Sequence, residues 1–313
     1  MKLRITAVCD VGSVRGNNED MILVGEKVFR DERVQGAIEL DERASLFAVA
    51  IADGMGGANA GEVASEFVLV QLRTGLATIP TDLDDMAFHV AINALCLGIH
   101  QRVLHEGIAD PAKSGMGSTL VGLLIYQGRL LFISAGDSRL YRFRDATLMQ
   151  IPRDHSLREL SAVGDAGGTS QVPSNIIVNS FGGGSSFFVD IGVAARKVQD
   201  DDVFFLCSDG VSDVLSDEEL EAILGTEGRE DAVLAAAIDK GSQDNISYVL
   251  VEVSEIGSVS PQSREGGVPV DGVDGILTTG APVFGDGNQG ESAGDHRKSV
   301  SPLEKVLLRD LDV

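Results

Sequence analysis

The sequence has 313 residues, of which 43% are hydrophobic, and its mean hydropathy is +0.11. A chain of this size and composition can bury one sizeable core, so we expect one globular domain followed by a tail. Its 48 acidic and 25 basic residues give a formal net charge of −23, which argues against partners such as nucleic acid or anionic membrane surfaces.

The start of the chain, MKLRITAVCD, alternates like a strand and lacks the apolar core of a signal peptide. No run of 18 apolar residues occurs anywhere, so we expect no membrane span and a cytoplasmic location. The three cysteines, at positions 9, 96 and 207, match no zinc or disulfide spacing and are expected to be small core side chains.

Hydrophobic periodicity predicts strands and helices in both halves of the chain. In the first half we expect strands over 2–9, 21–29 and 45–52, a charged loop over 30–43, a helix from about residue 60, and a second helix from an N-cap at Thr81 to about residue 104. In the second half we expect strands over 118–126, 130–135, 139–143, 148–151, 176–180, 187–194, 203–208 and 245–253, and helices over 155–163, after a capping box at Ser216, and over 230–238.

The closely spaced strands imply antiparallel pairing, and by periodicity alone the fold class is α+β. The composition changes at about Glu255, after which residues 255–313 are rich in Gly, Ser, Pro and Val and carry ten acids and five bases. We therefore predict a folded domain over 1–254 and a low-complexity, disordered acidic tail over 255–313.

Acidic residues stand at the ends of several predicted strands: Asp10, Glu19, Asp20, Asp53, Asp137, Asp209 and Asp244. Two of them, Asp53 and Asp209, follow strongly apolar strands and precede a glycine. Taken alone, an Asp-Gly pair is more often a simple turn, but the recurrence indicates a shared site. Packed carboxylates repel one another unless cations lie between them. Oxygen ligands without His or Cys favour Mg²⁺ or Mn²⁺.

Seven short segments, spread over about 240 residues, contain these acids together with glycines, an arginine and hydroxyl residues. They are Asp10-x-Gly12-x-x-Arg15-x-x-Asn18-Glu19-Asp20, Asp53-Gly54-Met55-Gly56-Gly57-x-x-x-Gly61-Glu62, Gly115-Met116-Gly117-Ser118-Thr119, Gly136-Asp137-Ser138-Arg139-x-Tyr141, Asp154-His155-Ser156, Cys207-Ser208-Asp209-Gly210 and Asp244-Asn245. On these residues the chain resembles the metal-dependent protein phosphatases, that is, the type 2C, or PPM, serine/threonine phosphatases in their compact bacterial form.

The resemblance implies a fold, a four-layer α/β/β/α sandwich of two antiparallel sheets, and a role for each matched residue. Asp53 would bridge two metal ions with help from the carbonyl of Gly54, and Asp209 and Asp244 would hold the first ion. Glu19 and Asp20 would act around the second ion, partly through water, and Asp137 with Asp209 would match the position that holds a third, weaker ion in bacterial members. Arg15 would clamp the substrate phosphate, and His155 is expected to be structural.

The implied activity is hydrolysis of phosphoserine and phosphothreonine in proteins through a bridging water activated by two or three Mn²⁺ or Mg²⁺ ions. Substrates would be phosphorylated proteins, a cognate Ser/Thr kinase would be the opposing enzyme, and we expect a monomer. An alternative is a catalytically inactive scaffold of the same fold that binds phosphopeptides. One departure from the family is the short, Gly-rich stretch at 164–170, where relatives carry a longer flap.

Overall fold

The computed structural model describes residues 1–40, 46–56, 60–159, 176–183 and 187–256. The chain divides into two units, Met1–Ser260 and Pro261–Val313, and all described residues belong to the first. The predictions for the Gly-rich stretch at 164–170 and for the tail after residue 256 lie outside the described residues.

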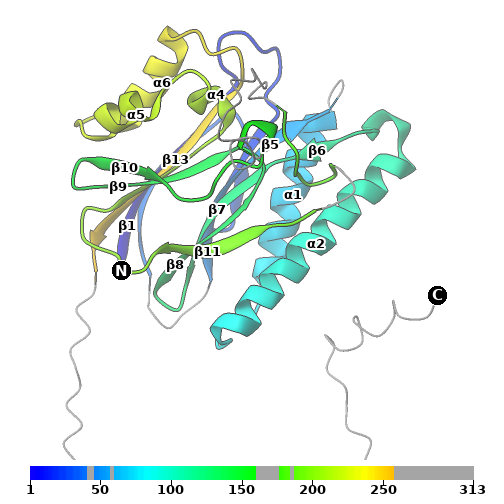
Figure 1. Ribbon diagram of the computed structural model, residues 1–313, viewed down its shortest axis with the longest axis horizontal. Coiled ribbons are helices and arrows are strands. Elements are labelled where there is room, and N and C mark those ends of the chain that lie inside the picture. Colours follow the sequence, from blue (N-terminus) through cyan, green and yellow to red (C-terminus); the bar gives the residue numbers. More distant parts are fainter. Residues whose placement is uncertain (41–45, 57–59, 160–175, 184–186, 257–313) are drawn as a thin grey trace, which may run out of the picture. The chain divides into compact units, whose positions relative to one another are not determined.

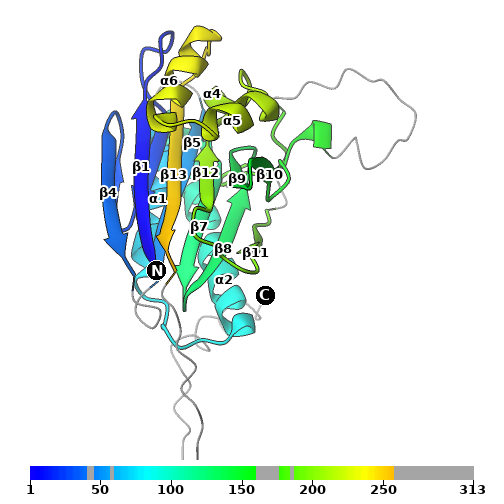
Figure 2. The ribbon, with the colours of Figure 1, turned by 90° about the vertical axis from the view of Figure 1, so that its left-hand side faces the viewer.

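Two antiparallel sheets form the centre of the first unit (Figures 1 and 2). The first sheet has the order β10-β9-β12-β13-β1-β4, with bounds Thr147–Gln150, Arg139–Arg144, Val203–Cys207, Ile246–Glu255, Lys2–Asp10 and Arg33–Glu39. The second has the order β11-β8-β7-β5-β2-β3, with bounds Asp190–Ala195, Arg129–Ala135, Leu120–Tyr126, Phe47–Met55, Asp20–Val24 and Lys27–Phe29, and β6 (Gly117–Ser118) pairs with β5.

Helices cover the outer face of each sheet (Figure 1). Helices α1 (Ala60–Leu76) and α2 (Asp85–Ala109) pack on the second sheet, followed by the 3₁₀ turn η1 (Pro111–Lys113). Helices α4 (Asp209–Ser212), α5 (Asp217–Leu224) and α6 (Arg229–Asp239) pack on the first sheet. None of the helices within the described ranges is long and apolar enough to cross a membrane.

Three apolar cores hold these layers together, one between each sheet and its covering helices and one between the two sheets. In β1, Leu3, Ile5 and Ala7 all enter the core between the sheets, as the alternating pattern predicts. The predicted four-layer α/β/β/α sandwich of the α+β class is therefore confirmed.

Four predictions about individual elements were wrong. The expected loop over 30–43 contains β4, a mostly exposed edge strand in which only Val34 and Ile38 pack partly against the core. The expected single strand over 21–29 is a hairpin, β2 and β3, because Gly25 takes a φ of +57° between them. Around the expected strand over 176–180, the described residues form only isolated bridges, such as Ser156 with Ile177. Thr81 is not the N-cap of α2, because Asp84 caps that helix.

Candidate metal centre

Two of the predicted acids lie directly opposite each other on neighbouring strands. Asp53 on β5 pairs in register with Asp20 on β2, so both backbones are fixed by the same antiparallel ladder. The strand carrying Asp53 was predicted to end at Ala52, but β5 continues to Met55 and pairs with β6. Asp53 is therefore held by strand hydrogen bonding rather than by a free turn.

The other acids reach the same region from the ends of three elements. Asp137 lies in the turn between β8 and β9, Asp209 begins α4 directly after β12, and Asp244 precedes β13. Since β12 is hydrogen-bonded to both β9 and β13, these three chain segments run side by side. We call Asp20, Asp53, Asp137, Asp209 and Asp244 the acid cluster.

Burial raises the pKa of four of these carboxyls, and the neighbouring carboxylates raise it further. The pKa of Asp20 rises from 3.8 to about 7, as does that of Asp137, and that of Asp209 rises to about 6. The pKa of Asp53 is raised well above its usual value, by burial first and then by its four partners in the cluster. Divalent cations would neutralise this mutual repulsion.

The oxygen atoms of the cluster test whether the residues suit a cation. Among the described residues, Oδ1 of Asp137 and Oδ1 of Asp209 are buried and have no hydrogen-bond partner. A buried carboxylate oxygen without a donor is costly, and a hard cation satisfies it. No three acidic, histidine or cysteine side chains of the described ranges are yet arranged as a complete ligand set. The residues fit Mg²⁺ or Mn²⁺ in type and charge, although their side chains must close up around an ion.

Arg15 and Glu19 lie at the rim of the cluster. The Arg15 side chain is 46% exposed; it donates from Nη2 to Asp244 Oδ2 at 2.5 Å and from Nε to the carbonyl of Gln243 at 3.2 Å. Burial raises the pKa of Glu19, which the positive charge of Arg15 partly offsets. Asp10, the remaining candidate acid, accepts the Gly12 N–H at 2.8 Å and so stabilises the turn that follows β1.

Gly54 lies at a close approach of three chain segments. A Cβ at this position would lie 2.0 Å from the carbonyl oxygen of Gly61 and 2.8 Å from that of Glu19. The Gly54 N–H donates to the Glu19 carbonyl at 3.1 Å. Only glycine allows α1 and the Glu19 segment to reach the end of β5 together.

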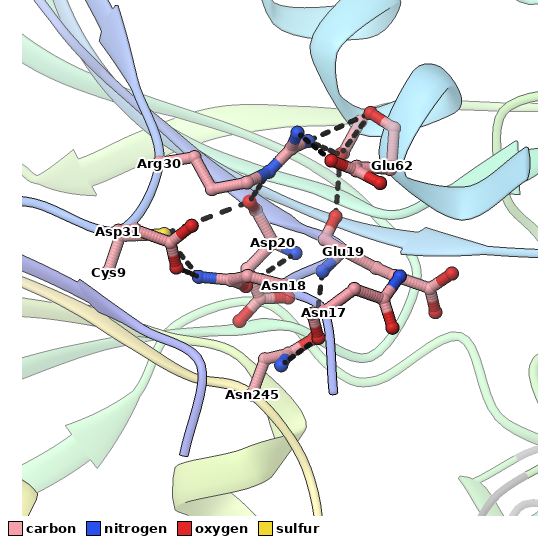
Figure 3. A network of polar contacts seen from close by, with 10 residues as sticks. Cys9, Asn17, Asn18, Glu19, Asp20, Arg30, Asp31, Glu62 and Asn245 are labelled. Carbon is pink, nitrogen blue, oxygen red and sulfur yellow. Dashed lines mark hydrogen bonds and ion pairs between the residues drawn. The ribbon is translucent and has the colours of Figure 1, made fainter. Parts of the chain in front are cut away.

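Several polar residues that support the acids had no role assigned from the sequence (Figure 3). Asn245 accepts the Glu19 N–H at 2.8 Å and donates to the carbonyls of Val11 and Asn17, both at 2.9 Å. Arg30, which is outside the recognised motifs, binds the Asp20 carbonyl at 3.0 Å and Glu62 Oε1 at 3.1 Å.

Two hydroxyl groups support the cluster more directly. Ser208 Oγ donates to Asp20 Oδ2 at 2.8 Å, and the Asp53 N–H donates to Thr119 Oγ1 at 3.0 Å. The recognised motifs include Ser208, Thr119 and Asn245. Their place in a motif was the only indication from the sequence that these residues belong to the site.

A polar cavity of about 530 Å³ opens beside Asp137 and Asp209 and is lined also by Asp154, Arg158 and Asp213. A second cavity, of about 690 Å³, lies between β4, the end of α1 and the Phe47 end of β5. Its lining is mainly apolar and includes none of the acid cluster. This cavity is therefore not the candidate metal site.

Buried carboxylates that suit divalent cations, set beside an arginine on a two-sheet α+β scaffold, are the arrangement expected of the phosphatase family that the sequence resembles. Residues 29–228 match the family model described as Protein phosphatase 2C. The chain belongs to the protein phosphatase 2C family.

Individual relatives agree with this assignment. The serine/threonine protein phosphatase PstP of Mycobacterium tuberculosis is 31% identical over 258 residues, which are 80% of this chain and 45% of PstP. This chain thus spans about half the length of that relative. The solved S. agalactiae serine/threonine phosphatase superposes with a TM-score of 0.68 at 26% identity, covering 80% of this chain and 100% of that one.

A second solved structure is the catalytic domain of PstP in complex with two manganese ions. It has a TM-score of 0.62 and 28% identity, and the match covers 82% of this chain and 100% of that domain. The two manganese ions belong to that structure.

Proposed function

We propose that this chain hydrolyses phosphoserine and phosphothreonine in proteins and opposes a cognate Ser/Thr kinase. The observation that carries the proposal is the acid cluster, whose buried, mutually repelling carboxylates include two oxygens without a donor. Two of the relatives, PstP and the S. agalactiae enzyme, are named serine/threonine phosphatases, which supports the substrate class. A cytoplasmic monomer with no nucleic-acid or membrane partner remains part of this proposal.

Each residue has a proposed task at the site. Asp53, with the Gly54 carbonyl, would be shared by two Mn²⁺ or Mg²⁺ ions. Asp209 and Asp244 would hold the first ion, Glu19 and Asp20 would act around the second, and Asp137 with Asp209 would hold a third. Bound cations of this kind supply an activated water for in-line attack on phosphorus. The ladder between Asp20 and Asp53 fixes the two backbones from which these carboxylates extend.

Arg15 orients the substrate. Its planar guanidinium can donate two parallel hydrogen bonds to phosphate oxygens, and its side chain is already exposed at the rim. To do so it must exchange its contact with Asp244 for the phosphate. If Asp244 held a cation, its carboxylate would no longer be free to pair with Arg15, and the guanidinium would be available to the phosphate.

The test is hydrolysis of p-nitrophenyl phosphate and of a phosphothreonine peptide in Mn²⁺, Mg²⁺ or EDTA, with wild type and Asp209→Ala. We expect turnover that needs the metal and falls to the EDTA level in the variant. Specific binding of the phosphopeptide by folded wild type without turnover in any metal would instead favour the inactive scaffold.

A further inference from the structure

The peptide that presents Asp137 to the acid cluster is held on both sides by His155. The Gly136 N–H donates to His155 Nδ1 at 3.2 Å, and the His155 N–H donates to the Gly136 carbonyl at 2.8 Å. Gly136 has a φ of +118°, and a Cβ there would lie 2.7 Å from Thr119 side-chain atoms. The backbone in front of Asp137 is therefore confined from two directions.

The hydrogen bonds around His155 also determine its tautomer. The Phe188 N–H donates to Asn179 Oδ1 at 3.2 Å, which orients the amide so that its Nδ2 faces His155 Nδ1 at 2.7 Å. His155 Nδ1 thus meets two donors and must be the unprotonated nitrogen. Nε2 then carries the hydrogen and donates it to Asp190 Oδ2 at 3.1 Å.

We propose that His155, oriented by Asp190 and Asn179, is a positioning residue that sets the affinity of the Asp137 site for a divalent cation. Asp137 Oδ1 is buried without a hydrogen-bond partner among the described residues, so no hydrogen bond fixes that oxygen. Its direction instead follows from the Gly136 peptide, which His155 holds. This inference rests on the proposed function, because it assumes that the Asp137 carboxylate receives an ion.

The side chain at 155 offers a matched pair of substitutions. In His155→Asn, the amide oxygen takes roughly the place of Nδ1 and can still accept the Gly136 N–H. In His155→Gln, the amide reaches the place of Nε2, so the contact with Asp190 survives and the Gly136 N–H loses its acceptor. A purely packing role would rank these two variants by size, and Gln would be the better replacement.

The measurement is a Mn²⁺ titration of the full chain, with free Mn²⁺ followed by electron paramagnetic resonance and turnover of p-nitrophenyl phosphate recorded in parallel. Loss of a residue that orients a metal ligand costs about 10- to 100-fold in metal affinity, so we expect the weakest Mn²⁺ site of His155→Gln to lose about tenfold or more. We expect His155→Asn to stay within about threefold of wild type, and full turnover to return to His155→Gln at saturating Mn²⁺. His89→Gln, on the exposed face of α2, is the control.

Wild-type Mn²⁺ affinity in His155→Gln, or an equal loss in both variants, would overturn the inference. If His155→Gln does not fold, Asp190→Ala carries the same test, since its side chain is 47% exposed. There we expect the weakest site to lose several-fold in affinity, and an unchanged affinity counts against the proposal. A wild type that binds Mn²⁺ nowhere would refute the proposed function itself, which separates the two failures.

Discussion

Gly210 stands where a side chain would collide with the backbone beside Asp244. A Cβ there would lie 1.9 Å from the carbonyl oxygen of Asn245. Gly210→Ala must therefore push α4 away from the start of β13, and we expect it to lower the free energy of unfolding by about 1–3 kcal/mol. Chemical denaturation measures this change.

The matched control is Gly98→Ala, inside α2, where an added Cβ meets nothing within 4 Å. Alanine is the better helix former, so we expect this variant to gain up to about 1 kcal/mol. Equal effects of the two substitutions would mean that the contact at Gly210 does not constrain the site.

Some site residues could be recognised from local sequence, and others could not. Asp53 and Asp209 each follow an apolar strand and precede a glycine, a pattern visible in a few consecutive residues. Asn245 acts on Glu19 and Val11, which lie 226 and 234 positions away in the sequence, and no local pattern reports such pairing. The supporting contacts therefore required the three-dimensional structure.

At the scale of elements, the N-cap of α2 is Asp84 and not Thr81, the residue that the sequence favoured. The Asp84 side chain accepts the Ala87 N–H at 2.8 Å, as an N-cap side chain does. We expect Asp84→Ala to cost about 0.5–2 kcal/mol of stability, because an N–H of the first turn loses its acceptor. Thr81→Ala should change the thermal midpoint very little, and a larger loss from Thr81→Ala than from Asp84→Ala would contradict this assignment.

The reason for the misplaced cap is tertiary. The N–H of Leu83 donates to the Tyr126 hydroxyl at 2.8 Å, and that hydroxyl donates to the Pro80 carbonyl at 2.9 Å. These contacts hold residues 80–83 in a connection to β7 and delay the helix. Strand β4 was missed for a similar reason, since its place is set by pairing with β1 rather than by its own side chains.

At the scale of the whole molecule, the acid cluster makes the stability of the metal-free protein depend on pH. Carboxyls with a usual pKa of 3.8 have folded values of about 7 for Asp20 and Asp137 and about 6 for Asp209. Below pH 3.8 both the folded and the unfolded states hold these protons, so the cluster imposes no penalty. As pH rises towards about 7, the unfolded state releases its protons first and is favoured.

We therefore expect the denaturant midpoint in EDTA to fall as pH rises from about 4 to about 7. Mn²⁺ should reverse the trend over the upper part of this window, because ions bind the ionised carboxylates. Asp20→Asn removes one titrating group and should flatten the slope in EDTA. A denaturant midpoint in EDTA that rises with pH across the same window would show that burial does not raise the pKa of these acids.

The layered architecture was predictable because the recognised motifs are tied to strand ends, and the apolar alternation of strands such as β1 agrees with the two-sheet packing. What the pattern left open was how the sheets are completed at their edges. Strand β4 forms the edge of one sheet and the three-residue strand β3 forms the edge of the other, and neither of these two strands is fully buried.

The most direct test of the account is the melting temperature of wild type and Asp53→Asn at neutral pH, in EDTA and in Mn²⁺. Asparagine keeps the shape of the side chain and removes a charge that burial and four neighbouring carboxylates oppose. We predict that Asp53→Asn melts at a higher temperature than wild type in EDTA, and that Mn²⁺ stabilises wild type strongly and the variant little. A variant that is destabilised in EDTA and keeps the full Mn²⁺ response would contradict the claim that this cluster is a cation site.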